Sequence, residues 1–291
     1  MKKCLKYSIS LILIIVSIFS STGCTADSME NIDITVTNYP NEYITKNLYS
    51  EHAKISAVYP DGVNTTDYKF STKQKKDFAK TDLFIYNGLI EKERELAIEL
   101  LDLNPDLKII DSAYVLETEY SPEELWLNPS SLLMMSQNIR IGLAEYISSN
   151  VLKEEVDLKY EELKIELSEL DANYRLTIEN TDDKVIVVDN PALKFLEKFG
   201  LQVLCVDDNA TDKTISDAKN LIKDKTISYI YTFVDEEESD NTENIMAEYT
   251  DVKKIELHKL DNISDKERSE EKNYLTIMEE NLNLLKQELY Q

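Results

Sequence analysis

The sequence is poor in glycine and cysteine, and each shortage excludes a class of structure. Five glycines in 291 residues leave no glycine-rich loop of the kind that binds phosphate groups. Of the three cysteines, Cys4 and Cys24 lie near the N-terminus, and only Cys205 lies in the region expected to fold. A single thiol cannot form a disulfide framework, and the apolar run LQVLCV around Cys205 predicts a small residue of the core.

Histidine is also scarce: the chain has only His52 and His258. The sequence shows no Ser/His/Asp or Cys/His arrangement, no H-E-x-x-H motif and no nucleophile elbow. Glu123 and Glu124 form an acidic pair, but such pairs are common in so acidic a chain. We therefore expect no enzymatic activity.

Positive charge is in the minority, since 32 Lys and Arg residues face 56 Asp and Glu residues, for a formal net charge of −24. Removal of residues 1–23 would take away three lysines and no acid, which leaves 29 basic against 56 acidic residues. Phosphate backbones would be repelled, so the charge argues against nucleic-acid binding. A dense acidic run at Asp235–Asp240 is interpreted as solvated surface.

The N-terminal segment has the features of an export signal. Three lysines precede the apolar run Leu11–Phe19, which is short for a membrane span, and the small residues Ser21–Gly23 lead to Cys24. This resembles a bacterial lipobox, with residues 1–23 as signal peptide, Cys24 as the lipidated residue and residues 24–31 as a tether. An ordinary signal peptide or an anchor helix is the alternative. We expect a chain outside the cytoplasm, held by lipid on the outer face of the cytoplasmic membrane.

The rest of the chain is organised around a long amphipathic stretch, Val151–Asn180. Its apolar residues recur at helical spacing, namely Val156, Tyr160, Leu163, Leu167, Leu170 and Tyr174. Short apolar runs alternate with helical stretches on both sides of it. They are Ile32–Val36, Ala53–Val58, Asp82–Tyr86 and Lys108–Ile110, then Lys184–Val188, Gln202–Val206, Ser228–Phe233 and Lys253–Leu257.

This alternation predicts the α/β class, with mainly parallel sheets in two lobes. The predicted lobes are residues 32–150 and 181–291, joined by one long rigid helix over residues 151–180, with a cleft between the lobes as the ligand site. An ordinary core helix or a coiled-coil strand is the alternative reading of the long stretch.

Several segments, in chain order, resemble a known family. Pro60–Tyr68 reads PDGVNTTDY, and Lys80–Leu89 reads KTDLFIYNGL. Further matches are Leu125–Pro129, Val187–Ala192, Phe199–Leu201, Leu257–Ile263 and Tyr274–Leu282. Over Ile32–Tyr290 the chain resembles the metal-binding lipoproteins of zinc and manganese ABC transporters. The resemblance implies two lobes joined by a helix, a metal ion in the cleft and a membrane permease as partner, and we expect a monomer.

The resemblance also implies four ligand positions, and they lack histidine. The three positions that are usually histidine fall on Thr66, Glu124 and Asn190, and the carboxylate position falls on Asp261. Each has an ordinary structural reading as well: Thr66 as a helix cap, Glu124 as a solvated acid, Asn190 as an N-cap before Pro191, and Asp261 as a loop residue.

An oxygen set of this kind suits Ca²⁺, Mg²⁺ or Mn²⁺ better than Zn²⁺, which prefers imidazole and thiolate. Three functions therefore stay open. The first is capture of a divalent metal ion (Zn, Mn, Ca or Mg) at an altered, oxygen-rich or degenerate site. The second is binding of a non-metal small solute. The third is a metal-free surface lipoprotein that acts as an adhesin or binds a partner.

Overall fold

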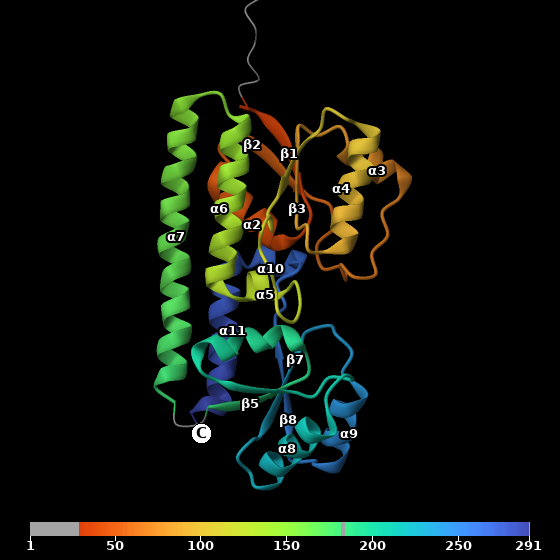
Figure 1. Ribbon diagram of the computed structural model, residues 1–291, viewed down its shortest axis with the longest axis vertical. Helices are drawn as coiled ribbons and strands as arrows, with labels where there is room; N and C mark the ends of the chain where they lie inside the picture. Colours follow the sequence, from red (N-terminus) through yellow and green to blue (C-terminus); the bar gives the residue numbers. More distant parts are fainter. Residues whose placement is uncertain (1–28, 182–183, 291) are drawn as a thin grey trace, which may run out of the picture.

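The computed structural model describes residues 29–181 and 184–290, and it consists of two α/β lobes (Figure 1). The predicted signal peptide, Cys24 and most of the predicted tether lie outside these residues. Within them, no helix is both long and apolar enough to cross a membrane.

Each lobe contains a four-stranded parallel sheet. The first sheet has the order β2-β1-β3-β4 and comprises β1 (Ile32–Val36), β2 (Ala53–Ala57), β3 (Leu83–Tyr86) and β4 (Lys108–Asp111). The second repeats this topology in the order β6-β5-β7-β8, with β5 (Val185–Val188), β6 (Gln202–Cys205), β7 (Tyr229–Phe233) and β8 (Lys253–Leu257). All eight strands lie within one residue of the predicted runs at either end, and the predicted α/β class is confirmed.

Helices cover both faces of each sheet, so the strands are buried on both sides, as parallel sheets require. In the first lobe, α2 (Tyr39–Tyr49) and α6 (Pro129–Tyr146) cover one face, and α3 (Thr72–Phe78) and α4 (Glu91–Leu103) cover the other (Figure 1). Alternate residues of one strand serve the two faces. Leu83 and Ile85 of β3 face α2 and α6, whereas Phe84 packs with Leu96 and Leu100 of α4.

The second lobe is built in the same way. The 3₁₀ helix η1 (Pro191–Phe199) and α11 (Tyr274–Leu289) share one apolar core with β5 and β7, and α8 (Asp212–Lys223) and α9 (Asp240–Glu248) share another. Cys205 is buried in the first of these cores, and burial raises the pKa of its thiol to about 11. The thiol is therefore protonated at neutral pH, in keeping with its predicted core role.

The long helix α7 (Asn150–Glu179) runs along the first lobe and reaches the second lobe near β5 (Figure 1). Its buried residues include all six that the sequence pattern named, together with Leu152 and Ile178. It packs against α2 and α6 of the first lobe and against η1 and α11 of the second. A single buried apolar cluster extends from β1 through α7 to β8, so the two lobes share one core.

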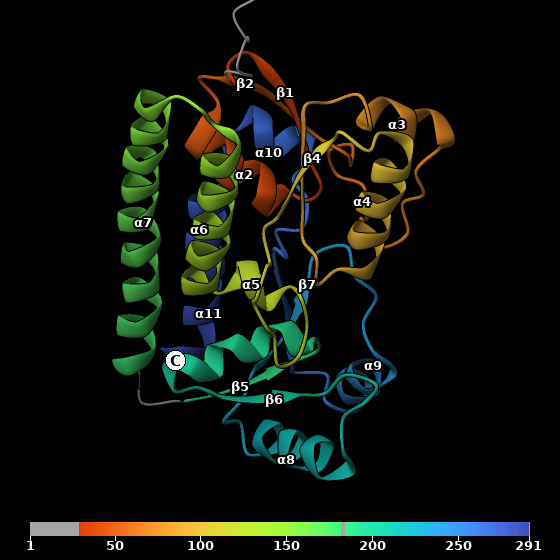
Figure 2. The same ribbon diagram turned by 45° about the horizontal axis from the view of Figure 1, so that its top comes forward.

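The chain after β8 returns to the first lobe, which the sequence did not predict. The short helix α10 (Asp265–Ser269) lies beside α2 (Figure 2), and α11 then runs back along α7 into the second lobe. Main-chain hydrogen bonds hold this return: Tyr39 N–H donates to the carbonyl of Asp261 at 3.1 Å, and Gly62 N–H donates to that of Ile263 at 2.9 Å. Two helices and one extended segment therefore connect the lobes, where the sequence predicted a single helix.

Candidate functional site

The carboxyl ends of both sheets face the space between the lobes, where ligands of open α/β sheets commonly bind. Two cavities lie there, of about 400 and 500 Å³. Asn64, Glu236 and Lys259 line the smaller one, and Thr65 and Glu123 line the larger one. Asp261 lines both cavities.

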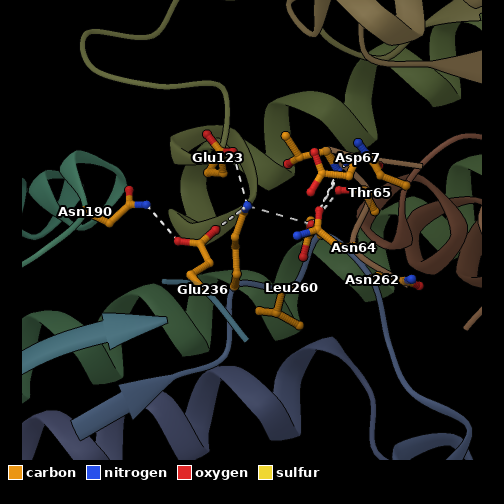
Figure 3. A network of polar contacts seen from close by, with 12 residues as sticks. Asn64, Thr65, Asp67, Glu123, Asn190, Glu236, Leu260 and Asn262 are labelled. Atoms are coloured by element: carbon orange, nitrogen blue, oxygen red, sulfur yellow. Dashed lines mark hydrogen bonds and ion pairs between the residues drawn. The ribbon is translucent and has the colours of Figure 1, made fainter. Parts of the chain in front are cut away.

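Three carboxylates from different segments surround one positive charge at this point. The Nζ of Lys259 lies 2.6 Å from Oε1 of Glu236, 3.8 Å from Oε1 of Glu123 and 3.9 Å from Oδ2 of Asp261. Glu123 precedes α5 (Glu124–Leu127) in the first lobe, whereas Glu236 follows β7 in the second. Figure 3 shows the ion pairs that join the labelled Glu123 and Glu236 to the same nitrogen atom.

Lys259 is largely withdrawn from solvent, with 13% of its side chain exposed. Burial alone would lower the pKa of its ammonium group, but Asp261, Glu236 and Glu123 outweigh burial and raise that pKa above its usual value. The ammonium group is therefore charged at neutral pH, and the cleft contains a cation that belongs to the chain itself.

The backbone around Lys259 is fixed by both lobes. The indole Nε1 of Trp126 donates to the carbonyl oxygen of Lys259 at 2.8 Å. Leu260 is fully buried with φ +64°, a left-handed conformation that is uncommon outside glycine. Its N–H donates to Nδ1 of His258 at 2.9 Å, which holds the turn in place. These contacts direct the side chains of Lys259 and Asp261 into the cleft.

Asp261 also accepts a hydrogen bond from the first lobe, from Oγ1 of Thr65 at 2.6 Å. The loop that carries Thr65 is held by Lys92, whose Nζ donates to the carbonyl of Thr65 at 2.7 Å and of Thr66 at 3.2 Å. Asn64 stabilises the same turn, since its Oδ1 accepts from Thr66 N–H at 2.8 Å. The loop that forms the side wall of the cleft is therefore held by hydrogen bonds from α4 and by one within the loop itself.

The four residues implied by the resemblance take different places in this arrangement. Thr66 and Asp261 line the same cavity. Asn190 is the N-cap of η1, accepting from Ala192 N–H at 2.9 Å, and its Nδ2 donates to Oε2 of Glu236 at 3.1 Å. Asn190 thereby contacts the carboxylate that pairs with Lys259. That these four residues bind a metal ion together remains a prediction.

Glu124 is turned toward its own loop. Its Oε1 accepts hydrogen bonds from the N–H groups of Tyr120 at 2.5 Å and Ser121 at 2.6 Å. The neighbouring Glu123 lines the cavity instead. The structure therefore places Thr66 and Asp261 on one cavity and connects Asn190 to Asp261 through Glu236 and Lys259. It places the Glu124 carboxylate in a turn.

Neither histidine takes part in the carboxylate cluster. Nε2 of His52 lies 2.9 Å from Glu155 of α7, away from the cleft. His258 lines the smaller cavity, but its Nδ1 accepts from Leu260 and its Nε2 lies 3.2 Å from Glu267. Both ring nitrogens of His258 are thus engaged within the protein.

The cleft suits a cation in its charge, but it is not a preformed metal site. In the part of the chain that the structure describes, no three His, Cys, Asp or Glu side chains are arranged to hold a metal ion. Metal–oxygen distances run from roughly 2.0 to 2.6 Å. Because Glu123 and Asp261 lie 3.8 and 3.9 Å from the ammonium nitrogen, both would have to move inward around an ion at that position.

A buried carboxylate, Glu93 of α4, lies in the wall of the larger cavity with 2% of its surface exposed. Its oxygens accept from Oγ1 of Thr37, from Nδ2 of Asn38 at 3.1 Å and from Asn87 N–H at 2.8 Å. Burial outweighs these hydrogen bonds and raises the pKa of Glu93 from 4.5 to about 7.

This pKa predicts a pH dependence of stability. Between about pH 4.5 and 7 the folded chain holds the Glu93 proton and the unfolded chain has lost it, so stability falls as pH rises through this window. Glu93→Gln should therefore show a smaller drop in melting temperature between pH 5 and pH 8 than the unmodified chain. Glu91→Gln, which removes an exposed carboxylate on the same helix, should leave the drop unchanged. If the melting temperature of Glu93→Gln fell as much between pH 5 and pH 8 as that of the unmodified chain, Glu93 would not be the group that causes the pH dependence.

Comparisons with known proteins agree with this architecture. A family model described as zinc-uptake complex component A, periplasmic, matches residues 34–288. The high-affinity zinc uptake system protein ZnuA of Bacillus subtilis is 23% identical over 296 residues, covering 93% of this chain and 92% of that protein. The zinc-binding lipoprotein AdcA of Streptococcus pneumoniae is 22% identical and covers 88% of this chain and 55% of AdcA, so the chain spans about half that relative's length.

The solved structure of the Zn(II)-bound ZnuA-like domain of Streptococcus pneumoniae AdcA superposes with a TM-score of 0.72 at 23% identity. The match covers 90% of this chain and 100% of that domain. At this level of identity the likeness shows the shared fold, with two lobes around a cleft.

Proposed function

The chain belongs to the zinc-uptake component A family of extracytoplasmic solute-binding proteins, and from that premise we propose that it is the binding subunit of an ABC uptake system. The family is not one of enzymes, in agreement with the sequence. On this proposal the chain is lipid-anchored through Cys24 and delivers its cargo to a membrane permease. The cargo is a divalent metal ion, bound between the lobes through carboxylate oxygens.

One observation carries the proposal: carboxylates from both lobes converge on a single cation position. Glu123 comes from the first lobe, and Glu236 and Asp261 come from the second. A divalent ion that drew these oxygens together would connect the lobes, which is what a cleft-closing ligand must do. Thr65, already bonded to Asp261, and Asn190, bonded to Glu236, would hold the carboxylates in orientation.

The donor chemistry favours hard cations. Carboxylate and hydroxyl oxygens suit Mn²⁺, Ca²⁺ or Mg²⁺, whereas tight zinc sites use imidazole or thiolate. The ring nitrogens of His258 are engaged elsewhere, and Cys205 is buried in the core. We therefore propose that zinc binds far more weakly here than at a site of three histidines.

The test is a thermal-shift panel on chelator-treated protein. A divalent ion at a hundredfold excess over its Kd should stabilise the fold by about 2.7 kcal/mol. Asp261→Asn and Glu236→Gln should abolish the shift with Mn²⁺, Ca²⁺ or Mg²⁺. Glu248→Gln, which removes a surface carboxylate paired with Lys219, should retain it.

Other arms of the panel separate the alternatives. A shift with amino acids or polyamines, and none with metals, would favour a non-metal solute. No shift with any addition would favour a protein that acts through its surface. Glu124→Gln tests the ligand set taken from the resemblance, because loss of the shift in that variant would place Glu124 in the metal shell.

A further inference from the structure

We propose that Lys259 sets the cation affinity of the cleft, because its ammonium group occupies the position that a bound ion would take. The inference rests on the proposed function and concerns the same site. An ion would bind only by displacing Lys259, so the lysine acts as a competitor tethered to the protein. The negative charge of the cleft is therefore partly neutralised before any ion arrives, by one ammonium group among three carboxylates.

The first support is the geometry of the ammonium group. It makes one close ion pair, at 2.6 Å with Glu236, and two longer ones, at 3.8 and 3.9 Å with Glu123 and Asp261. The three carboxylate side chains are 29%, 25% and 23% exposed, in that order. Without a cation, carboxylates this close and this shielded would repel one another. Lys259 reduces that repulsion, as a bound metal ion does in an acidic site.

The second support is that the lysine is held in place by its backbone. Trp126 of the first lobe binds the carbonyl of Lys259, and the buried left-handed turn at Leu260 fixes the residue that follows. The main chain of Asp261 is bonded to Tyr39 of the first lobe. The ammonium group is thus directed at the carboxylates by contacts from both lobes, which would be unnecessary for a lysine that merely met a nearby acid.

The third support is that the side chain has room to withdraw. Lys259 lines the smaller cavity of about 400 Å³, which Glu123 does not line. Its flexible four-carbon stem could move there while the backbone stays in place. A divalent ion has twice the charge of the ammonium group and binds oxygens at roughly 2.0–2.6 Å, so it can replace Lys259 where a monovalent ion gains little.

The decisive experiment is calorimetric titration of chelator-treated protein with Mn²⁺. Lys259→Met removes the charge and keeps the apolar stem, so it should bind Mn²⁺ roughly tenfold or more tightly than the unmodified chain. Lys254→Met is the matched control. Lys254 lies in β8 of the same lobe and also pairs with two carboxylates, Glu238 at 2.5 Å and Glu256 at 3.0 Å, but outside the cleft. Lys254→Met should bind Mn²⁺ with the same affinity as the unmodified chain.

Lys259→Arg separates charge from shape, since it keeps the positive charge and should bind no more tightly than the unmodified chain. If Lys259→Met is unstable without metal, Lys259→Gln should show the same gain. Equal binding by the unmodified chain and Lys259→Met would overturn the inference and leave the proposed function standing. Tightening in Lys259→Arg equal to that in Lys259→Met would also overturn it. Failure of every variant to bind Mn²⁺, Ca²⁺, Mg²⁺ or Zn²⁺ would overturn both the inference and metal ions as the cargo.

Discussion

Replacement of Trp126 by alanine is expected to lower the free energy of unfolding by about 3–5 kcal/mol, the range for a fully buried aromatic side chain. Trp126 is 1% exposed and lies in α5, at the junction of the two lobes. Its Nε1 binds the carbonyl of Lys259, and its own carbonyl accepts from Tyr274 Oη at 2.6 Å. The substitution therefore removes apolar packing and leaves the Lys259 carbonyl without its donor. Chemical denaturation of the chelator-treated protein measures the change.

Trp126→Phe is the control that separates these two losses. It keeps a six-membered aromatic ring and removes the indole N–H with the rest of the five-membered ring, so most of its cost, about 1–3 kcal/mol, should come from the unpaired buried carbonyl of Lys259. If Trp126→Ala cost no more than Trp126→Phe, packing of the indole would not be the main contribution. If both variants were as stable as the unmodified chain, the contacts of Trp126 between the lobes would not contribute to the stability of the fold.

The strands and the long helix could be predicted from the sequence because their burial is regular. Strands buried on both faces appear as short apolar runs, and α7 shows one apolar face over eight turns. The return of α10 to the first lobe could not be predicted in this way. It depends on contacts between segments far apart in the chain, such as Gly62 with Ile263, for which no periodic pattern exists.

The candidate site was predictable only in part, for a physical reason at each residue. Asp261 and Thr66 were named and do line one cavity. The resemblance points to Glu124, which stays a prediction, whereas Glu123 is the one that lines the cavity; a shift of one residue along a helical turn changes which carboxylate faces the cleft, and the sequence shows both. Glu236 lies in an acidic run that was interpreted as solvated surface.

Lys259 gives almost no signal in the sequence. It is one of 32 basic residues and belongs to no motif. Its position two residues before Asp261, on an apolar strand end, was the one clue available. Recognition of its role requires the left-handed turn at Leu260, which places Lys259 and Asp261 on the same cavity wall. A search for buried lysines near predicted metal ligands could find such residues in related chains.

Ion pairs of Arg268 also hold the returning segment against the first lobe, and we call this contact the Arg268 clamp. Its removal is the second substitution expected to lower the free energy of unfolding strongly. The guanidinium group of Arg268 in α10 binds two carboxylates of the first lobe by forked hydrogen bonds. It reaches Glu42 at 2.9 and 2.7 Å and Asp61 at 2.5 and 2.9 Å. The Glu42 side chain is only 5% exposed. Removal of the guanidinium group would leave this carboxylate with Lys46 alone, at 2.5 Å.

Arg268→Met is therefore expected to cost about 2–4 kcal/mol, below the usual upper limit for breaking a buried pair because Lys46 still compensates Glu42. Arg268→Lys keeps the charge and loses the double fork, so it should fall between Arg268→Met and the unmodified chain. Hydrogen exchange should become faster over residues 258–273 in Arg268→Met, while α7 stays protected, because α7 and α11 still connect the lobes through their shared core. Faster exchange throughout α7, or small-angle scattering that shows wide opening of the lobes, would mean that the clamp, and not the shared core, holds the lobes together.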